Sequence, residues 1–236
     1  DARTRRMLAE GLRGFVNPGE IVALPAVLGI DNHSEVLADF KKILGAEVFE
    51  IASLPPCVPG MRLNNKLVAT AKNERVDYVL GSKVTGCTVA DGKVVSVTVG
   101  TAGAGKEIKA DAVVLAGGGF ESGALKLDSH GHLHETILDL PVTMPEGVKE
   151  EDLIHGDYWG SPQPLFLCGV EVDETMLVTY QGKPVHSNVY AAGGVIAGAT
   201  RWQEKSGEGI ALGSAIKAAD AILSSVGAGA ATKERN

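Results

Sequence analysis

The chain has 236 residues, 44% of them hydrophobic, and a net charge of −7 at pH 7. This length suits one large domain or two small ones, and the hydrophobic fraction provides for a packed core. The negative charge argues against nucleic acid or an anionic membrane surface as a partner. The three cysteines, Cys57, Cys87 and Cys168, form no CxxC pair, which argues against a disulfide framework, a zinc site or an iron–sulfur cluster.

The N-terminal region predicts a helix followed by a β-α-β unit. Residues 1–15 carry apolar side chains at helical spacing, and Ile21–Leu28 has the composition of a buried strand. A second helix is expected from the capping residues at 31–34 to Leu44, where Gly45 ends it. Glu47–Ile51 is the next expected strand, and a right-handed parallel crossover is the default connection. The longest apolar stretch, 21–30, is too short to span a bilayer.

A proline-rich loop, residues 54–63, presents Arg62 at the start of a predicted helix over residues 63–73. An arginine held in this way can bind a carboxylate or phosphate through two hydrogen bonds. The alternative is an ordinary surface salt bridge, which spacing alone favours.

Short strands are expected next at 76–80, 83–89, 94–99 and 107–109. Asp91-Gly92 lies between the second and third of these strands. This dipeptide is a strong indication of a hairpin turn.

The stretch ADAVVLAGGGF, residues 110–120, is the centre of the predicted sheet. Ala112–Ala116 is a short apolar run typical of a strand buried on both faces, and it leads into Gly117, Gly118 and Gly119. Ligands of open α/β sheets lie at the carboxyl ends of strands, and glycine permits close approach to the main chain. The alternative is a structural turn without a ligand.

A second strand-and-glycine element closes the chain. Val189–Ala192 runs into Gly193-Gly194, and a glycine-rich segment, 206–209, precedes a helix expected over residues 210–223. Such a helix start binds anions, although capping by Ser206 explains the same pattern. The tail, residues 227–236, is expected to be disordered.

Two further segments carry chemistry-bearing side chains. His130, His132 and His134 alternate and would share one face of a strand, which suits a metal, but no carboxylate or cysteine completes a site, and a polar loop is favoured. The turn-rich, aromatic segment at 156–164 suits a loop against a ligand or a partner.

Several of these motifs together resemble a flavoprotein family. "ADAVVLAGGGF", "NVYAAGGVIAG" and "GEGIALGSAIKAA" look like flavin-domain segments of the fumarate-reductase-like superfamily, which binds dinucleotides through two such elements. "VALPAVLGIDNHSEVLADFKKILGAEVFEIASLPPCVPGMRL", "ETILDLPV" and "GDYWGSPQPLFLCGVEVDET" resemble the B-subunit family of the anaerobic glycerol-3-phosphate dehydrogenases. The resemblance extends from about Glu20 to Ala219.

The chain departs from this family at two places. The family begins with a β-α-β unit carrying GxGxxG, and this chain has no such unit, so it is expected to be an N-terminally truncated part of a longer subunit. The family's closing turn is richer in glycine, whereas this chain reads Ala199-Thr200-Arg201-Trp202.

The resemblance implies an α/β fold: a partial FAD/NAD(P)-binding, Rossmann-like flavin domain that lacks its first βαβ unit, with a second α/β lobe. The flavin-domain remnant is expected at 61–127 and 186–226, and the second, substrate-side lobe at 1–60 and 128–185. An absent strand would leave an exposed sheet edge, which predicts self-association.

The implied function is that of a flavin-containing subunit in the oxidation of glycerol 3-phosphate to dihydroxyacetone phosphate, with quinone as the electron acceptor. The implied cofactor is FMN, with FAD as the alternative, held weakly or not at all by this part of the chain. The implied partners are a catalytic FAD subunit and an iron–sulfur membrane-anchor subunit. The expected location is cytoplasmic, at the inner face of the cell membrane, without a membrane span of its own.

The implied cofactor residues lie in the two glycine elements: Gly117, Gly118, Gly119, Ala192, Gly193, Gly194, Gly207, Glu208, Gly209 and Ile210. His33 and Arg62 are the expected polar groups of the cleft, and no acid–base pair or metal site is apparent. Two alternatives remain open: a docking module that binds no flavin, or a fumarate-reductase-like enzyme acting on another small acid.

Overall fold

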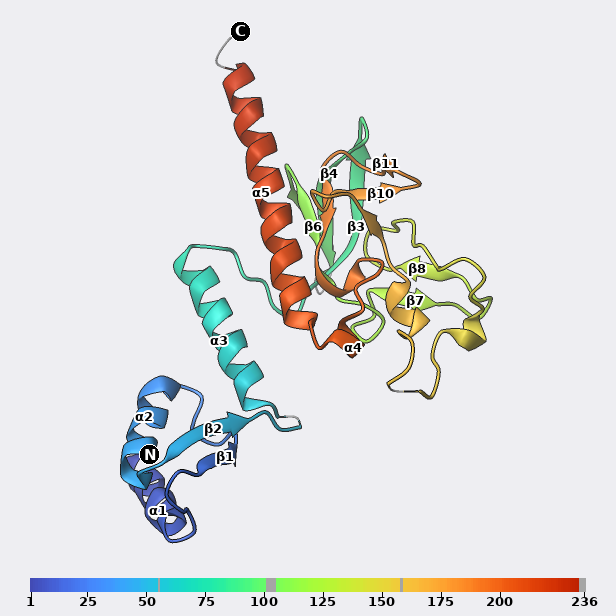
Figure 1. Cartoon of the computed structure of the whole chain (residues 1–236). Coiled ribbons are helices and arrows are strands. Elements are labelled where there is room, and N and C mark those ends of the chain that lie inside the picture. The colour runs from blue at the N-terminus through green and yellow to red at the C-terminus, as the bar shows by residue number, and fades with distance from the viewer. Residues whose placement is uncertain (55, 101–104, 158, 234–236) are drawn as a thin grey trace. The chain divides into compact units, whose positions relative to one another are not determined.

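The computed structural model describes residues 1–54, 56–100, 105–157 and 159–233, with the side chains of 203–204 and 227–233 outside the description. The chain divides into two compact units, Asp1–Leu80 and Gly81–Asn236 (Figure 1). Each unit has a hydrophobic core of its own.

The first unit contains the predicted β-α-β arrangement. Strands β1 (Ile21–Pro25) and β2 (Glu47–Ile51) pair in parallel, with helix α2 (His33–Leu44) between them in the chain. Helix α1 (Ala2–Arg13) packs against α2. The core of this unit is the following set: Ala9, Leu28, Phe40, Leu44 and Val48.

Three local features of the first unit differ from the expectations. Asn32 precedes α2 in a left-handed conformation and makes no capping hydrogen bond through its side chain, although Gly45 ends the helix as expected. Helix α3 (Val58–Asn73) begins before Arg62 because Pro59 is tolerated in a first helical turn. Residues 76–80 form no strand, since no other segment pairs with them. Pro55 lies outside the described residues.

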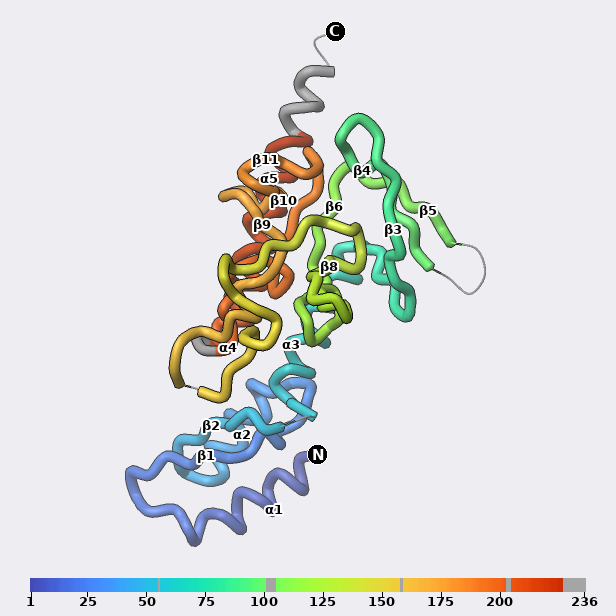
Figure 2. The backbone as a smooth tube through the Cα atoms, turned by 90° about the vertical axis from the view of Figure 1, so that its right-hand side faces the viewer, coloured from blue at the N-terminus to red at the C-terminus, as the bar shows by residue number. Residues whose placement is uncertain are grey.

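The second unit contains an antiparallel three-stranded sheet made of β3 (Lys83–Ala90), β4 (Lys93–Gly100) and β5 (Lys106–Lys109) (Figure 2). The predicted hairpin turn is confirmed: Asp91 and Gly92 have φ angles of 50° and 72°. Two consecutive positive φ angles belong to the type I′ turn that joins twisted strands.

The central strand of the prediction is β6 (Val113–Leu115), which pairs in parallel with β12 (Val189–Ala191). The expectation that this strand is buried on both faces is wrong, because Val114 is 41% exposed whereas Leu115 is 4% exposed. The physical reason is that β6 has a strand neighbour on one side only, in a two-stranded sheet.

The segment between β6 and β12 forms short strands and helical turns. The strands are β7 (Leu125–Leu127), β8 (Leu133–Glu135), β9 (Glu171–Val172), β10 (Val178–Tyr180) and β11 (Lys183–Pro184). The 3-10 turns are η1 (Glu150–Asp152), η2 (Pro164–Leu167) and, after β12, η3 (Gly193–Val195). These elements fold back on β6 and β12 and complete the unit.

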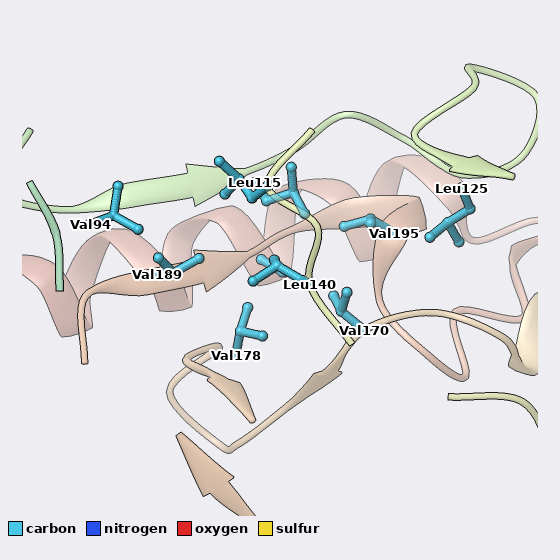
Figure 3. Close-up of a cluster of buried hydrophobic side chains, with 10 residues drawn as sticks. Val94, Leu115, Leu125, Leu140, Val170, Val178, Val189 and Val195 are labelled. Carbon is cyan, nitrogen blue, oxygen red and sulfur yellow. The ribbon is translucent and has the colours of Figure 1, made fainter. Parts of the chain in front are cut away.

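The core of the second unit joins side chains from all of these regions (Figure 3). Val94 comes from β4, Leu115 from β6 and Val189 from β12, and Leu140 and Val178 come from the intervening segment. The units therefore differ from the expected lobes: residues 128–185 share this core, and residues 61–80 belong with the first unit.

Helices α4 (Arg201–Glu204) and α5 (Gly207–Lys233) end the described chain. The expectation of a disordered tail is wrong for residues 227–233, which continue α5, while 234–236 lie outside the described residues. Ala218 is fully buried, whereas Leu212 and Leu223 are 63% and 70% exposed. By length and composition alone, the part Gly207–Val226 is apolar enough to cross a membrane.

Candidate functional site

The two glycine turns that the sequence singles out lie side by side. Leu115 and Ala191 are partners in the parallel β6–β12 ladder, and the Ala192 N–H donates to the Leu115 carbonyl at 2.9 Å. Both strands therefore end at the same edge of the sheet, where Gly117–Gly119 and Gly193–Gly194 follow them. The carboxyl ends of adjacent parallel strands are the usual place for a ligand in such sheets.

Arg201 connects the two turns. Its Nη1 donates to the Gly194 carbonyl at 3.4 Å, and its Nη2 donates to Glu121 Oε1 at 2.5 Å. The guanidinium carbon also lies 4.9 Å from the centroid of the Phe166 ring, within the range of a cation–π contact. The Arg201 side chain is 17% exposed, and that of Glu121 is 62% exposed.

The need for glycine at these turns comes from the approach of Arg201. A Cβ atom at Gly119 would lie 2.8 Å from Arg201 Nη2 and 3.0 Å from the Gly194 carbonyl oxygen. A Cβ atom at Gly194 would lie 3.0 Å from Arg201 Cζ. The close approach that the sequence predicts is thus made by a side chain of the protein itself.

The start of α5 belongs to the same region. The Gly193 N–H donates to Ser214 Oγ at 2.9 Å, and a Cβ atom at Gly207 would lie 3.7 Å from Arg201 Cβ. Gly207 and Ile210 are partly buried here, whereas Glu208 and Gly209 are exposed. The structure therefore brings the predicted 117–119, 192–194 and 207–210 segments together.

The electrostatics of the site centre on Glu121. Partial burial acts to raise the pKa of its carboxyl group, but hydrogen bonds from its own main chain and from Arg201, together with the positive charge of Arg201, lower the pKa below its ordinary value. Glu121 is therefore a carboxylate at neutral pH, and Arg201 carries the one positive charge that contacts both glycine turns among the described residues.

His33 and Arg62, the other predicted site residues, lie in the first unit and meet on Glu50. Arg62 Nη1 donates to Glu50 Oε2 at 2.6 Å, and His33 Nε2 lies 2.8 Å from the same oxygen. Arg62 also donates from Nε to the Gly29 carbonyl at 2.8 Å, and the Leu28 N–H donates to Glu50 Oε1 at 2.8 Å. The salt-bridge alternative thus describes the Arg62 contacts, although its partner is a buried carboxylate.

Glu50 is the residue of this cluster that sequence reasoning missed. Its side chain is 6% exposed. Desolvation acts to raise its pKa, while the hydrogen bonds from Arg62 and the Leu28 N–H and the nearby charges of Arg62 and His33 lower it below the ordinary value. The only indication in the sequence is a glutamate one position before the end of an apolar strand.

The three histidines predicted to alternate on one strand face are separated by a turn. Only His134 lies in β8; His132 and His134 approach the Asp128 carboxylate at 3.5 and 2.9 Å, and main-chain N–H groups donate to it as well. The His134 bond, followed by these N–H groups, holds the pKa of Asp128 well below its usual range. Within the described part of the chain, no three metal-ligating side chains come together.

The comparisons with known proteins identify the family. The sequence profile of the FAD binding domain family matches residues 1–210, which include all of the first unit and most of the second. The chain belongs to the FAD binding domain family. This membership agrees with the predicted Rossmann-like α/β class and with the flavoprotein resemblance.

Two relatives of this FAD binding domain chain support the finer resemblance. It is 30% identical to the probable B-subunit of the anaerobic glycerol-3-phosphate dehydrogenase of Halobacterium salinarum, over 94% of this chain and 51% of that protein. It is 28% identical to the B-subunit of the anaerobic glycerol-3-phosphate dehydrogenase of Yersinia pestis, over 93% of this chain and 50% of that protein. The chain thus spans about half the length of these relatives.

One solved structure also matches, the thioredoxin reductase of T. acidophilum, with 17% sequence identity and a TM-score of 0.21. The match covers 92% of this chain and 56% of that one. A TM-score this low carries no argument about the fold or the site.

Proposed function

We propose that this chain is the flavin-binding part of an oxidoreductase, with its flavin site at the carboxyl ends of β6 and β12. The observation that carries the proposal is the meeting of the two glycine turns at those strand ends, in a chain whose family is described as an FAD binding domain. Sequence separation between the turns is large, and the fold removes it.

The residues present fit the anionic part of a flavin. Arg201 offers a guanidinium group that matches phosphate in charge and geometry, and the glycine turns at 117–119 and 192–194 leave main-chain groups accessible beside it. A bound flavin supplies hydride and electron transfer, and the chain's residues supply binding and orientation. Gly207–Ile210 would contribute the start of α5 to the same site.

FAD is the cofactor that the family description names, and FMN remains the expectation from the resemblance. The names of the relatives support a finer proposal, namely electron transfer during the oxidation of glycerol 3-phosphate with quinone as acceptor. The same names support a role beside a catalytic FAD subunit and an iron–sulfur membrane-anchor subunit, at the cytoplasmic face of the membrane. In such a complex, His33 and Arg62 are proposed to act by holding the first unit together around Glu50.

The test is a titration of the purified chain with FAD and, separately, with FMN, followed by flavin fluorescence and visible absorbance. We expect saturable binding that weakens in Arg201→Gln. Arg75→Gln is the matched control, since it removes the same charge from an exposed position in the first unit. The ratio of the two dissociation constants decides between FAD and FMN.

Two results would contradict the proposal. Absence of binding for both flavins would mean that these residues do not hold the cofactor on their own. Equal binding by Arg201→Gln and the parent chain would move the site away from the two turns.

A docking module that binds no flavin is the second candidate. The observation that favours it is a row of exposed apolar side chains on α5, made of Leu212, Ile216, Leu223 and Val226, each more than half exposed. Exposed apolar surface of this kind is typical of interaction sites. Failure to bind flavin together with stable binding to partner subunits would support this candidate.

A further inference from the structure

We propose that Glu121 is a built-in counter-ion of Arg201, which occupies the anion-binding side of the guanidinium group and which the phosphate of a ligand must displace. This inference rests on the proposed function, because it concerns the ligand site at the ends of β6 and β12. It adds a regulatory contact that neither the family membership nor the relatives' names describe.

The first argument is the contrast in exposure between the two partners. Arg201 is 17% exposed and is held from three sides, by the Gly194 carbonyl, by the Phe166 ring and by the main chain at Gly119. Glu121 is 62% exposed. The arginine is therefore fixed in the protein, while its carboxylate partner reaches it from the solvent side. A solvent-borne anion can approach along that same direction.

The second argument concerns strength. Exposed ion pairs are weak because water solvates both charges and long side chains lose freedom on pairing. The Glu121 carboxylate is held by this contact and by its own main-chain N–H, and no other residue among those described donates to it. A phosphate group makes the same two-bond contact with a guanidinium and carries more charge, so it can replace the carboxylate.

The third argument is the place of the pair in the fold. Glu121 lies two residues after Gly119, and Arg201 follows the second glycine turn, so the ion pair joins the two turns across the sheet end. When the carboxylate leaves, Arg201 keeps its contact with Gly194 and stays beside both turns. Displacement thus opens a positive group without dismantling the site.

The test compares Glu121→Gln with the parent chain by isothermal titration calorimetry with inorganic phosphate at constant, low ionic strength. Glu174→Gln is the matched control, because it removes one negative charge from an exposed position elsewhere in the second unit. The upper range for an exposed pair corresponds to a factor of about five, so we expect phosphate to bind about two- to five-fold more tightly to Glu121→Gln. Glu174→Gln should match the parent chain.

The source of the phosphate is decided by paired probes. A tighter FMN affinity in Glu121→Gln with an unchanged riboflavin affinity would assign the group to the flavin. A tighter glycerol 3-phosphate affinity with FMN unchanged would assign it to a small phosphorylated substrate. These arms remain separate from the proposed function, since inorganic phosphate reports on Arg201 even if FAD does not bind.

Three outcomes would overturn the inference. The first is an equal gain in Glu121→Gln and Glu174→Gln, which would be a general charge effect. The second is undetectable phosphate binding in Glu121→Gln. The third is unchanged phosphate binding in the double variant Glu121→Gln/Arg201→Lys, which keeps the positive charge but removes the two-bond contact. Circular dichroism of each variant checks that the fold is intact.

Discussion

At the scale of single residues, buried charge explains the contacts of the first unit better than the ligand that the sequence suggests. Glu50 accepts from Arg62 and from the Leu28 N–H and lies beside His33. A carboxylate this well buried is costly unless it is paired. Three elements, β1, α2 and α3, therefore depend on one side chain of β2.

Replacing Arg62 by alanine should lower the free energy of unfolding by about 2 to 3 kcal/mol at pH 7, since it leaves Glu50 buried with fewer partners. The loss should shrink on acidification. The pKa of Glu50 in the folded chain lies below its ordinary value of 4.5, so its contribution is complete above that pH and is lost as the pH falls through the folded-state pKa. Urea unfolding between pH 7 and pH 3 measures both effects.

The matched control for this prediction is Lys41→Ala. Lys41 pairs with Glu47, which is 70% exposed, and such a pair contributes less than about 1 kcal/mol. Equal losses in the two variants, or a loss in Arg62→Ala that persists at pH 3, would show that Glu50 is not the cause.

At the scale of elements, the sequence predicts local patterns well and strand partners poorly. The β1–α2–β2 unit and the hairpin at Asp91-Gly92 follow from apolar periodicity and turn residues, and both are confirmed. Residues 76–80 have strand-forming composition but no partner, and composition does not encode a partner. Arg201 was noticed only as a departure from the family pattern, because its contacts with Gly194 and Glu121 depend on the fold.

One polar side chain fastens two elements of the second unit. Asn188, just before β12, donates from Nδ2 to the Val94 and Asp111 carbonyls at 2.8 and 2.9 Å and accepts from the Val94 N–H at 2.9 Å. It is 7% exposed. Asparagine supplies both the donor and the acceptor that this position requires.

Asn188→Asp keeps the shape but removes both donors and places a carboxylate oxygen against two carbonyls. We expect a loss of about 2 to 4 kcal/mol in the free energy of unfolding, because buried polar groups are left unpaired. Asn64→Asp, at an exposed position of α3, should change the value by less than about 0.5 kcal/mol. Thermal and urea unfolding of the two variants decide the point, and a small effect at Asn188 would contradict the proposed fastening.

At the scale of the whole molecule, one family match spans two separate cores. The profile of the FAD binding domain family covers residues 1–210, across the boundary between Leu80 and Gly81. The two cores share no buried side chain within the described residues. Interleaved lobes could be expected from the family resemblance, but only the fold reveals that residues 128–185 pack with β6 and β12.

Separate cores predict that damage to one unit stays within it, as expected for distinct cooperative units. In hydrogen-exchange mass spectrometry, Arg62→Ala should raise amide exchange in β1, α2 and β2 and leave β6 and β12 as in the parent chain. Asn188→Asp should do the reverse. Peptides from β1 and from β12 therefore serve as internal controls for each other. If either variant raised exchange in both sets of strands, the two units would have to be one cooperative structure, and the fall in stability caused by Arg62→Ala would extend to the candidate flavin site.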